Sequence, residues 1–131
     1  MARVTFRTPM GRVLGSGSAK SGTGHFWRQR VTAVALVLLG AWLLVALMRL
    51  PGFDHDTVRA WLDRPLNAVL MILLAGTAAW HSSLGVQVVI EDYVHQPLAR
   101  VTSLILSKFV HALLAAAAVF AVLDLAFGAA A

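Results

Sequence analysis

Residues 31–50 read VTAVALVLLGAWLLVALMRL, and this stretch decides the fold class. It carries a single charged side chain, Arg49, next to its end. An α-helix rises about 1.5 Å per residue, so a helix of this length covers about 30 Å, the thickness of the hydrocarbon core of a bilayer. The sequence therefore predicts a transmembrane helix over residues 31–50, which Pro51-Gly52 ends.

The composition excludes several protein classes. The 131 residues are 59% apolar and 13% charged, whereas a soluble domain has about 45–50% apolar and about 25% charged residues. The chain has no cysteine, which excludes disulfide scaffolds, thiolate zinc sites, iron–sulfur clusters and thiol catalysis within it. It also lacks a glycine-rich phosphate loop, a nucleophile elbow and an HExxH motif.

Two further apolar stretches follow, and they predict an all-α membrane protein with three transmembrane helices. Residues 66–90 form the second span, which Pro65 starts and a polar cluster around His81 interrupts. Residues 101–127 form the third, after a turn at Pro97. In the connection 51–64, the apolar residues Val58, Trp61 and Leu62 are spaced i, i+3 and i+4. This spacing favours a short amphipathic helix on the membrane surface, and the alternative is a polar loop.

The N-terminal residues 1–25 differ from the rest, being rich in Gly, Ser, Thr and Arg. They predict a flexible basic segment ahead of a three-helix membrane anchor domain over residues 26–127. An Arg-rich segment without acids is also typical of a secretory or mitochondrial targeting peptide. The apolar run that follows is too long for a signal peptide, so we expect the segment to be retained.

The charge distribution predicts the topology. Residues 1–30 hold six basic side chains and no acid, and positive charge flanks transmembrane helices on the cytoplasmic side. The N-terminus and the loop 91–100 are therefore expected in the cytoplasm and the C-terminus in the periplasm. This places the chain in a bacterial inner membrane, with the mitochondrial inner membrane as the alternative. Nucleic acid is not expected, because aromatic residues do not alternate with the basic ones.

His81 is the main candidate site residue, because an ionisable side chain within a span is costly and usually functional. At 100° per residue it shares one helix face with Gly85 and Asp92. Imidazole is a good axial ligand for haem iron, and small neighbours leave room for a flat macrocycle. The alternative is a histidine that hydrogen-bonds across the bundle, with serine and glycine permitting close packing.

Three other groups are candidates, each with a structural alternative. Asp92 and Tyr93 lie where the second helix leaves the membrane. A quinone carbonyl there could accept a hydrogen bond from the tyrosine, and the carboxylate could relay a proton. The alternative is an ordinary helix end with an interfacial tyrosine. Arg30 can pair with haem propionates or act only as an anchor. His111 lies at a depth similar to that of His81, so both could face one haem, or His111 could hydrogen-bond within the bundle.

The segment His81–Val94, HSSLGVQVVIEDYV, resembles the H-x3-G-x6-D-Y motif of the smaller hydrophobic membrane anchor of succinate dehydrogenase, respiratory complex II. Residues 29–33, QRVTA, resemble the Arg-x-Thr-Ala sequence at the start of that family's first span. The glycine- and serine-rich opening around residues 17–20 is similar to alphaproteobacterial members. The resemblance covers roughly residues 12–127.

The resemblance implies specific roles. His81 matches the axial ligand of a b-type haem whose second ligand comes from a sister anchor subunit, and Gly85 then packs against the haem. Tyr93 matches the residue that hydrogen-bonds ubiquinone. Asp92 matches its neighbour in proton supply, and Arg30 a basic residue near the haem propionates and the quinone pocket. His111 has no counterpart.

The resemblance also implies partners and an activity. The chain would anchor a flavoprotein subunit with FAD and an iron–sulfur subunit beside a sister cytochrome b anchor, in a succinate:ubiquinone oxidoreductase of the tricarboxylic acid cycle and respiratory chain. Three alternatives stay open: an assembly subunit without haem, the anchor of a fumarate reductase-type enzyme, and a small proton-coupled carrier that uses His81, His111 and Lys108.

Overall fold

The computed structural model describes residues 8, 10 and 22–128, and residues 22–128 form four α-helices. These are α2 (Gly22–Arg49), α3 (His55–Leu62), α4 (Pro65–Tyr93) and α5 (Pro97–Phe127), with no strand among the described residues. Proline occupies the first turn of both α4 and α5, where its missing N–H removes no helical hydrogen bond.

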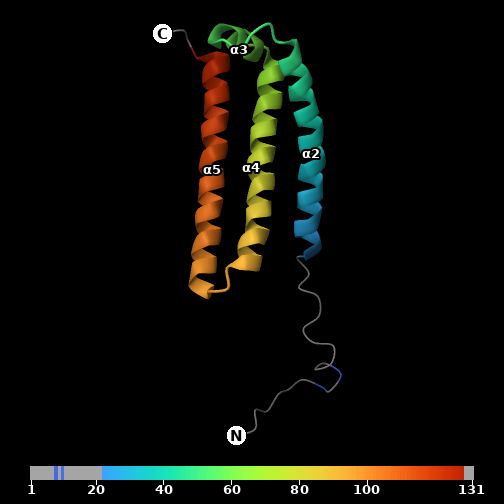
Figure 1. Ribbon diagram of the computed structural model, residues 1–131, viewed down its shortest axis with the longest axis vertical. Helices are drawn as coiled ribbons and strands as arrows, with labels where there is room; N and C mark the ends of the chain where they lie inside the picture. The colour runs from blue at the N-terminus through green and yellow to red at the C-terminus, as the bar shows by residue number, and fades with distance from the viewer. Residues whose placement is uncertain (1–7, 9, 11–21, 129–131) are drawn as a thin grey trace.

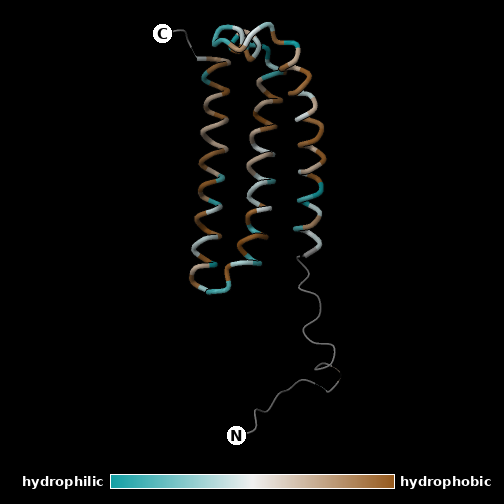
Figure 2. Tube along the Cα trace, in the orientation of Figure 1, coloured by the Kyte–Doolittle hydropathy of each residue, from teal (hydrophilic) through white to brown (hydrophobic). Residues whose placement is uncertain are grey.

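The three long helices lie side by side, with α4 in the middle (Figure 1). Helix α4 packs closely against both α2 and α5, whereas the backbones of α2 and α5 stay apart. The short helix α3 lies across one end of the row, which we call the α3 end; the other end, where the chain passes from α4 to α5, is the turn end. Figure 2 shows hydrophilic residues gathered at these two ends. Both open faces of α4 are thus available to lipid, ligand or partner.

The three predicted spans are confirmed as helices long and apolar enough to cross a membrane: Thr23–Arg49, Pro65–Tyr93 and Pro97–Phe127. Each helix is longer than its predicted span, and α2 begins nine residues before residue 31. The reason is that hydropathy marks the hydrocarbon core, while backbone hydrogen bonding continues into the headgroup region. Residues 22–25 therefore belong to α2, and residues 1–7, 9 and 11–21 of the predicted flexible segment lie outside the described residues.

The core is small and lies at the α3 end. Four buried residues from α3, α4 and α5 form it: Leu62, Ala68, Val122 and Ala126. Next to it, the indole of Trp61 on α3 stacks on that of Trp42 on α2, with ring centroids 5.7 Å apart. Most large apolar side chains of the long helices are exposed. In a membrane subunit these side chains meet lipid or other subunits, so the exposure is the expected state of the isolated chain.

Helix α3 confirms the predicted amphipathic helix, and Asp54 caps its N-terminus. The Asp54 carboxylate accepts hydrogen bonds from the Thr57 hydroxyl at 2.8 Å and from the Thr57 backbone N–H at 3.0 Å. These bonds, the hydroxyl first, lower the pKa of Asp54 below its ordinary value, since they favour the charged form. A lowered pKa means that the cap stabilises α3 above the ordinary carboxyl pKa and is lost as the pH falls through the native value.

Replacing Asp54 with alanine should destabilise α3 locally. Without the acceptor, the first-turn N–H groups lose their partner, and amide hydrogen exchange over residues 55–59 should become about five-fold faster. Asp54→Asn keeps an acceptor without a charge. The amides of Asp54→Asn should exchange nearly as slowly as those of the unmodified chain. In the unmodified chain, exchange should become faster below about pH 4, where the Asp54 carboxylate is protonated, and Asp54→Asn should not show this change. Equal exchange in all three proteins would show that the cap does not hold α3.

Candidate haem and quinone site

The site begins with a hydrogen bond between two helices. His81 on α4 and Thr32 on α2 are 49 residues apart, and the His81 Nδ1 lies 2.8 Å from the Thr32 hydroxyl oxygen. Thr32 is the one buried polar residue among those described, with 4% of its surface exposed, and His81 is half-buried. The alternative in which His81 bonds across the bundle is therefore observed at one of its two ring nitrogens.

The hydrogen bonds of Thr32 favour one tautomer of His81. The Thr32 hydroxyl lies 2.8 Å from the Arg28 carbonyl oxygen and 3.1 Å from that of Gln29, and its single hydrogen can be donated to its own helix. With that donation the hydroxyl accepts from His81, whose proton then lies on Nδ1. A neutral imidazole carries its lone pair on the other nitrogen, and no described residue hydrogen-bonds to Nε2. His81 therefore presents a free Nε2 lone pair, the form that binds a metal ion.

The surroundings of Gly85 add room one turn from His81. A methyl group built on Gly85 would meet only the Gln29 side-chain nitrogen, at 3.9 Å, which is an ordinary contact. The packing of this chain therefore does not require a glycine at this position. A flat ligand on the His81 face would require one, because any side chain there would occupy the space beside the ligand.

Asp92 and Tyr93 end α4 at the turn end, and both are exposed. The Tyr93 side chain is 78% exposed, and no described residue hydrogen-bonds to its hydroxyl or to the Asp92 carboxylate. Only the Tyr93 backbone carbonyl is engaged, by His95 Nδ1 at 3.1 Å. Both side chains are thus free to bind a molecule outside the chain, on the helix that carries His81.

Arg30 is the ninth residue of α2 (Gly22–Arg49) and points away from His81. Its guanidinium is 4.9 Å above the ring of Phe26, and it is exposed. It precedes Thr32 by two residues, about 200° around the helix, so it faces nearly opposite to the residue that contacts His81. Any contact of Arg30 with a haem or quinone must come from the outer side of α2.

His111 does not pair with His81. Its Nδ1 lies 2.7 Å from the Ser107 carbonyl and its Nε2 lies 3.1 Å from the Ser82 hydroxyl. The carbonyl can only accept, so Nδ1 carries the proton and Nε2 accepts from Ser82. The predicted similarity in depth is confirmed, since Ser82 is adjacent to His81, but both nitrogens of His111 are occupied. This arrangement favours the bundle histidine over a second ligand from the same chain.

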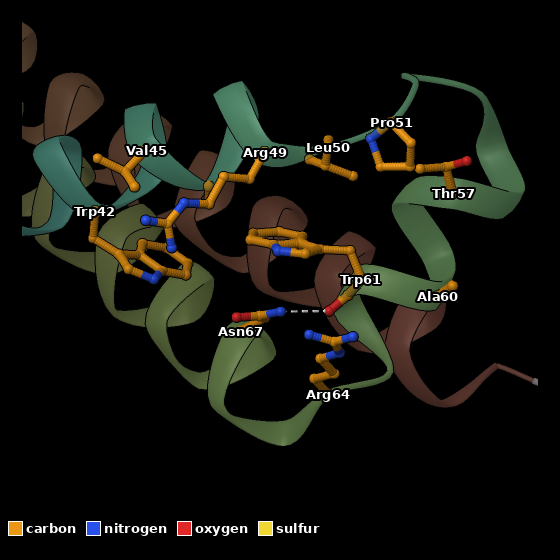
Figure 3. Close-up of a pocket in the computed structure, with 11 residues that line it drawn as sticks. Trp42, Val45, Arg49, Leu50, Pro51, Thr57, Ala60, Trp61, Arg64 and Asn67 are labelled. Carbon is orange, nitrogen blue, oxygen red and sulfur yellow. Dashed lines mark hydrogen bonds between the residues drawn. The ribbon is translucent and has the colours of Figure 1, made fainter.

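A well-formed cavity lies away from all of these residues, at the α3 end (Figure 3). It has a volume of about 520 Å³ between α2, α3 and α4. Trp42, Trp61, Arg49 and Asn67 line it, and the Asn67 amide donates to the Trp61 carbonyl at 2.7 Å. None of the predicted site residues lines it.

No group of three or more potential metal-ligating side chains is present in the described part of the chain. Thr32 has no role in the predictions made from the sequence. The signal for it was present in the QRVTA segment, but only the contact between α2 and α4 shows what its hydroxyl does.

Comparison with known proteins identifies the family. The family described as "Succinate dehydrogenase/Fumarate reductase transmembrane subunit" matches residues 5–123. The chain belongs to this family. The resemblance seen in the His81–Val94 segment is thereby confirmed, and with it the placement among multi-pass membrane anchor subunits.

Several relatives are described as succinate dehydrogenase membrane anchor subunits. The chain is 38% identical over 103 residues to the succinate dehydrogenase hydrophobic membrane anchor subunit of Rickettsia bellii, which covers 79% of this chain and 82% of the relative. It is 32% identical over 122 residues to that of Paracoccus denitrificans, covering 93% and 94%. The membrane anchor subunit of Reclinomonas americana is 33% identical over 94 residues, covering 70% and 78%. No solved structure gives a significant match.

Proposed function

We propose that the chain anchors a succinate:ubiquinone oxidoreductase in the membrane, that His81 supplies one axial ligand to a b-type haem, and that Tyr93 binds ubiquinone. The observation that carries the proposal is the Thr32–His81 hydrogen bond. It leaves the Nε2 lone pair of a half-buried histidine unused, on the side of α4 that meets α2, one turn from Gly85. An unused lone pair at membrane depth would have no purpose in an anchor that only packs against partners.

The residues present fit one half of a haem site. His81 would bind the iron through Nε2, and the space at Gly85 would take the edge of the macrocycle. The second ligand would come from a sister anchor subunit, because His111 is engaged with Ser82 and Ser107. When bound, a haem b supplies a one-electron carrier. The hydrogen bond to Thr32 would fix the orientation and the tautomer of the His81 imidazole, as outer-shell partners of metal-binding histidines do.

The exposed end of α4 supports the quinone assignment. The Tyr93 hydroxyl would donate a hydrogen bond to a ubiquinone carbonyl and hold the ring in place. Asp92 would relay protons from the aqueous phase to the quinone oxygens, which take up two protons as two electrons arrive from an iron–sulfur partner. Arg30, two residues before Thr32 and so near the depth of His81, would contact haem propionates or the quinone pocket from the outer side of α2.

The partners and orientation follow from this arrangement. The turn end would face the cytoplasm of a bacterium, where a flavoprotein and an iron–sulfur protein bind to the anchor, and the α3 end would face the periplasm. The positive charge of residues 1–30 favours this orientation. The absence of cysteine from the sequence requires that the iron–sulfur clusters reside on the partners, and the flavin would reside there with them.

A visible difference spectrum tests the proposal. The complex that co-purifies with the chain in mild detergent is reduced first with succinate and then with dithionite. A sharp b-type band that appears with succinate is the expected result. A band that appears only with dithionite would contradict the succinate assignment. The absence of any band would contradict the haem assignment and leave an assembly subunit without haem.

Thr32→Val should weaken haem binding while leaving the fold intact. Valine has nearly the shape of threonine but cannot accept from Nδ1, so the ring loses its orientation and tautomer. Loss of an outer-shell partner costs about 10–100-fold in metal affinity. The measurement is the rate at which haem is lost from the purified complex in detergent. Thr32→Ser retains the hydroxyl and should lose haem no faster than the unmodified complex. Equally fast loss of haem from both variants would show that the packing of the threonine methyl group, and not its hydroxyl, holds His81.

A further inference from the structure

A second cavity, of about 500 Å³, lies between α2, α4 and α5 in the half of the bundle toward the turn end. It is open to the outside because α2 and α5 flank α4 with their backbones apart. Four basic side chains line it: His25 and Arg28 from α2, and Lys108 and His111 from α5. No acidic side chain is among its lining residues. The cavity therefore has two permanent positive charges and no internal counter-ion.

Two of these basic groups have unsatisfied polar atoms. The Nε2 of His25 is buried and has no hydrogen-bond partner among the described residues. The ammonium of Lys108 has no hydrogen bond or ion pair within the described part of the chain, although Lys108 lies 11 residues into α5, about 16 Å from its start. A buried imidazole nitrogen without a partner and a cation without a counter-ion in a helix that can span a membrane are both costly. An anion bound between them would neutralise the ammonium, and it would accept a hydrogen bond from His25 when the Nε2 of that ring carries the proton.

Apart from Ser83 and Gln87, the rest of the lining is apolar and combines two large side chains, Trp80 and Leu84, with small residues. Further from the turn end, the cavity is lined by Gly76 and Ala79 of α4 and by Ala112 and Ala115 of α5. Its polar groups lie nearer the turn end, where Gln87 of α4 donates to Glu91 outside the cavity at 2.9 Å. The cavity thus changes from cationic on the side of the turn end to apolar on the side of the bundle centre. This is the polarity of a phospholipid, with a phosphate above an acyl chain.

The cavity is separate from the proposed haem face. Its α4 residues Ser83 and Gln87 follow His81 by two and six positions, which places them about 200–240° around the helix from it. His81 and Gly85 face the opposite side of α4. A ligand in the cavity therefore does not compete with a haem at His81, and the inference does not depend on haem or quinone binding.

We propose that this cavity binds an anionic membrane phospholipid. The phosphate would lie between Arg28, Lys108 and His25, and one acyl chain would lie along the small residues of α4 and α5. Basic pockets between transmembrane helices are suited to anionic headgroups, and two unpaired cations favour phosphatidylglycerol over the zwitterionic phosphatidylcholine. The lipid would join α2 to α5, whose backbones stay apart.

The first test is made on the unmodified complex. It is stripped of lipid with detergent, and its thermal stability is measured after addition of phosphatidylglycerol micelles, phosphatidylcholine micelles or inorganic phosphate at equal phosphorus concentration. Phosphatidylglycerol should raise the Tm, with little effect of the other two. An equal rise with inorganic phosphate would show a simple anion site and overturn the lipid assignment. An equal rise with phosphatidylcholine would overturn the role of the two cations.

The second test uses variants of the full complex. Native mass spectrometry and phosphorus analysis should show at least one phospholipid fewer per complex in the double variant Arg28→Gln/Lys108→Gln. The matched control is Arg100→Gln, which removes a positive charge from the first turn of α5 outside the cavity and should retain all bound lipid. Equal lipid content in all proteins would overturn the proposal. So would an acidic side chain of a partner subunit cross-linking to Lys108.

Discussion

Replacing His81 with leucine should remove the b-type haem band from the purified complex, with haem content falling by more than about tenfold. Leucine fills most of the volume of the ring but offers no lone pair to the iron. The substitution leaves no buried donor unpaired, because the Thr32 hydroxyl still donates to the Arg28 carbonyl at 2.8 Å. The helices should therefore keep their packing, and far-ultraviolet circular dichroism of the complex should not change.

His111→Leu is the matched control for this experiment. It removes an imidazole from a similar depth and from the neighbouring helix, where both ring nitrogens are already engaged by Ser82 and Ser107. This variant should retain haem, with an unchanged band position. Loss of haem from both variants would revive the pairing of two histidines from this chain. Loss from His111→Leu alone would show that the ligand has been wrongly assigned.

The contrast between these two histidines shows which features of the site can be predicted from the sequence and which cannot. Spacing within one helix places His81 at membrane depth and on the face of Gly85, because rise and rotation per residue are fixed. Hydropathy likewise predicts the three long helices, and i, i+3, i+4 spacing predicts α3. These are properties of a single helix, so they need no knowledge of its neighbours.

What the sequence could not provide is the rotation of one helix relative to another. That rotation brings Thr32 to His81 across 49 residues and turns Ser82 rather than His81 toward His111. It is set by contacts between helices that are far apart in the sequence, which no local pattern encodes. The two interpretations of His111 could be separated only when both ring nitrogens were assigned partners. The lengths of the three long helices were also underestimated, because backbone hydrogen bonding continues beyond the residues at which hydropathy falls.

Tyr93→Phe should lower ubiquinone reduction by succinate about 100-fold, because the hydroxyl is the group proposed to position and polarise a quinone carbonyl. The expected loss is not structural. The Tyr93 side chain is 78% exposed and its hydroxyl has no hydrogen-bond partner among the described residues, so phenylalanine breaks no bond within the chain. Haem content, assembly and the Tm of the complex should remain as in the unmodified protein.

Two assays separate the quinone role from a general defect. Reduction of a soluble phenazine acceptor by succinate, which needs only the flavoprotein and iron–sulfur partners, should be unaffected in Tyr93→Phe. Thr102→Val is the matched control: it also removes an exposed hydroxyl near the turn end, one that donates to the Leu98 carbonyl at 3.0 Å, and it should keep full ubiquinone activity. Full ubiquinone reduction by Tyr93→Phe would show that this tyrosine is only an interfacial anchor. An equal loss of ubiquinone reduction in both variants would indicate a disturbed turn and not a lost quinone contact.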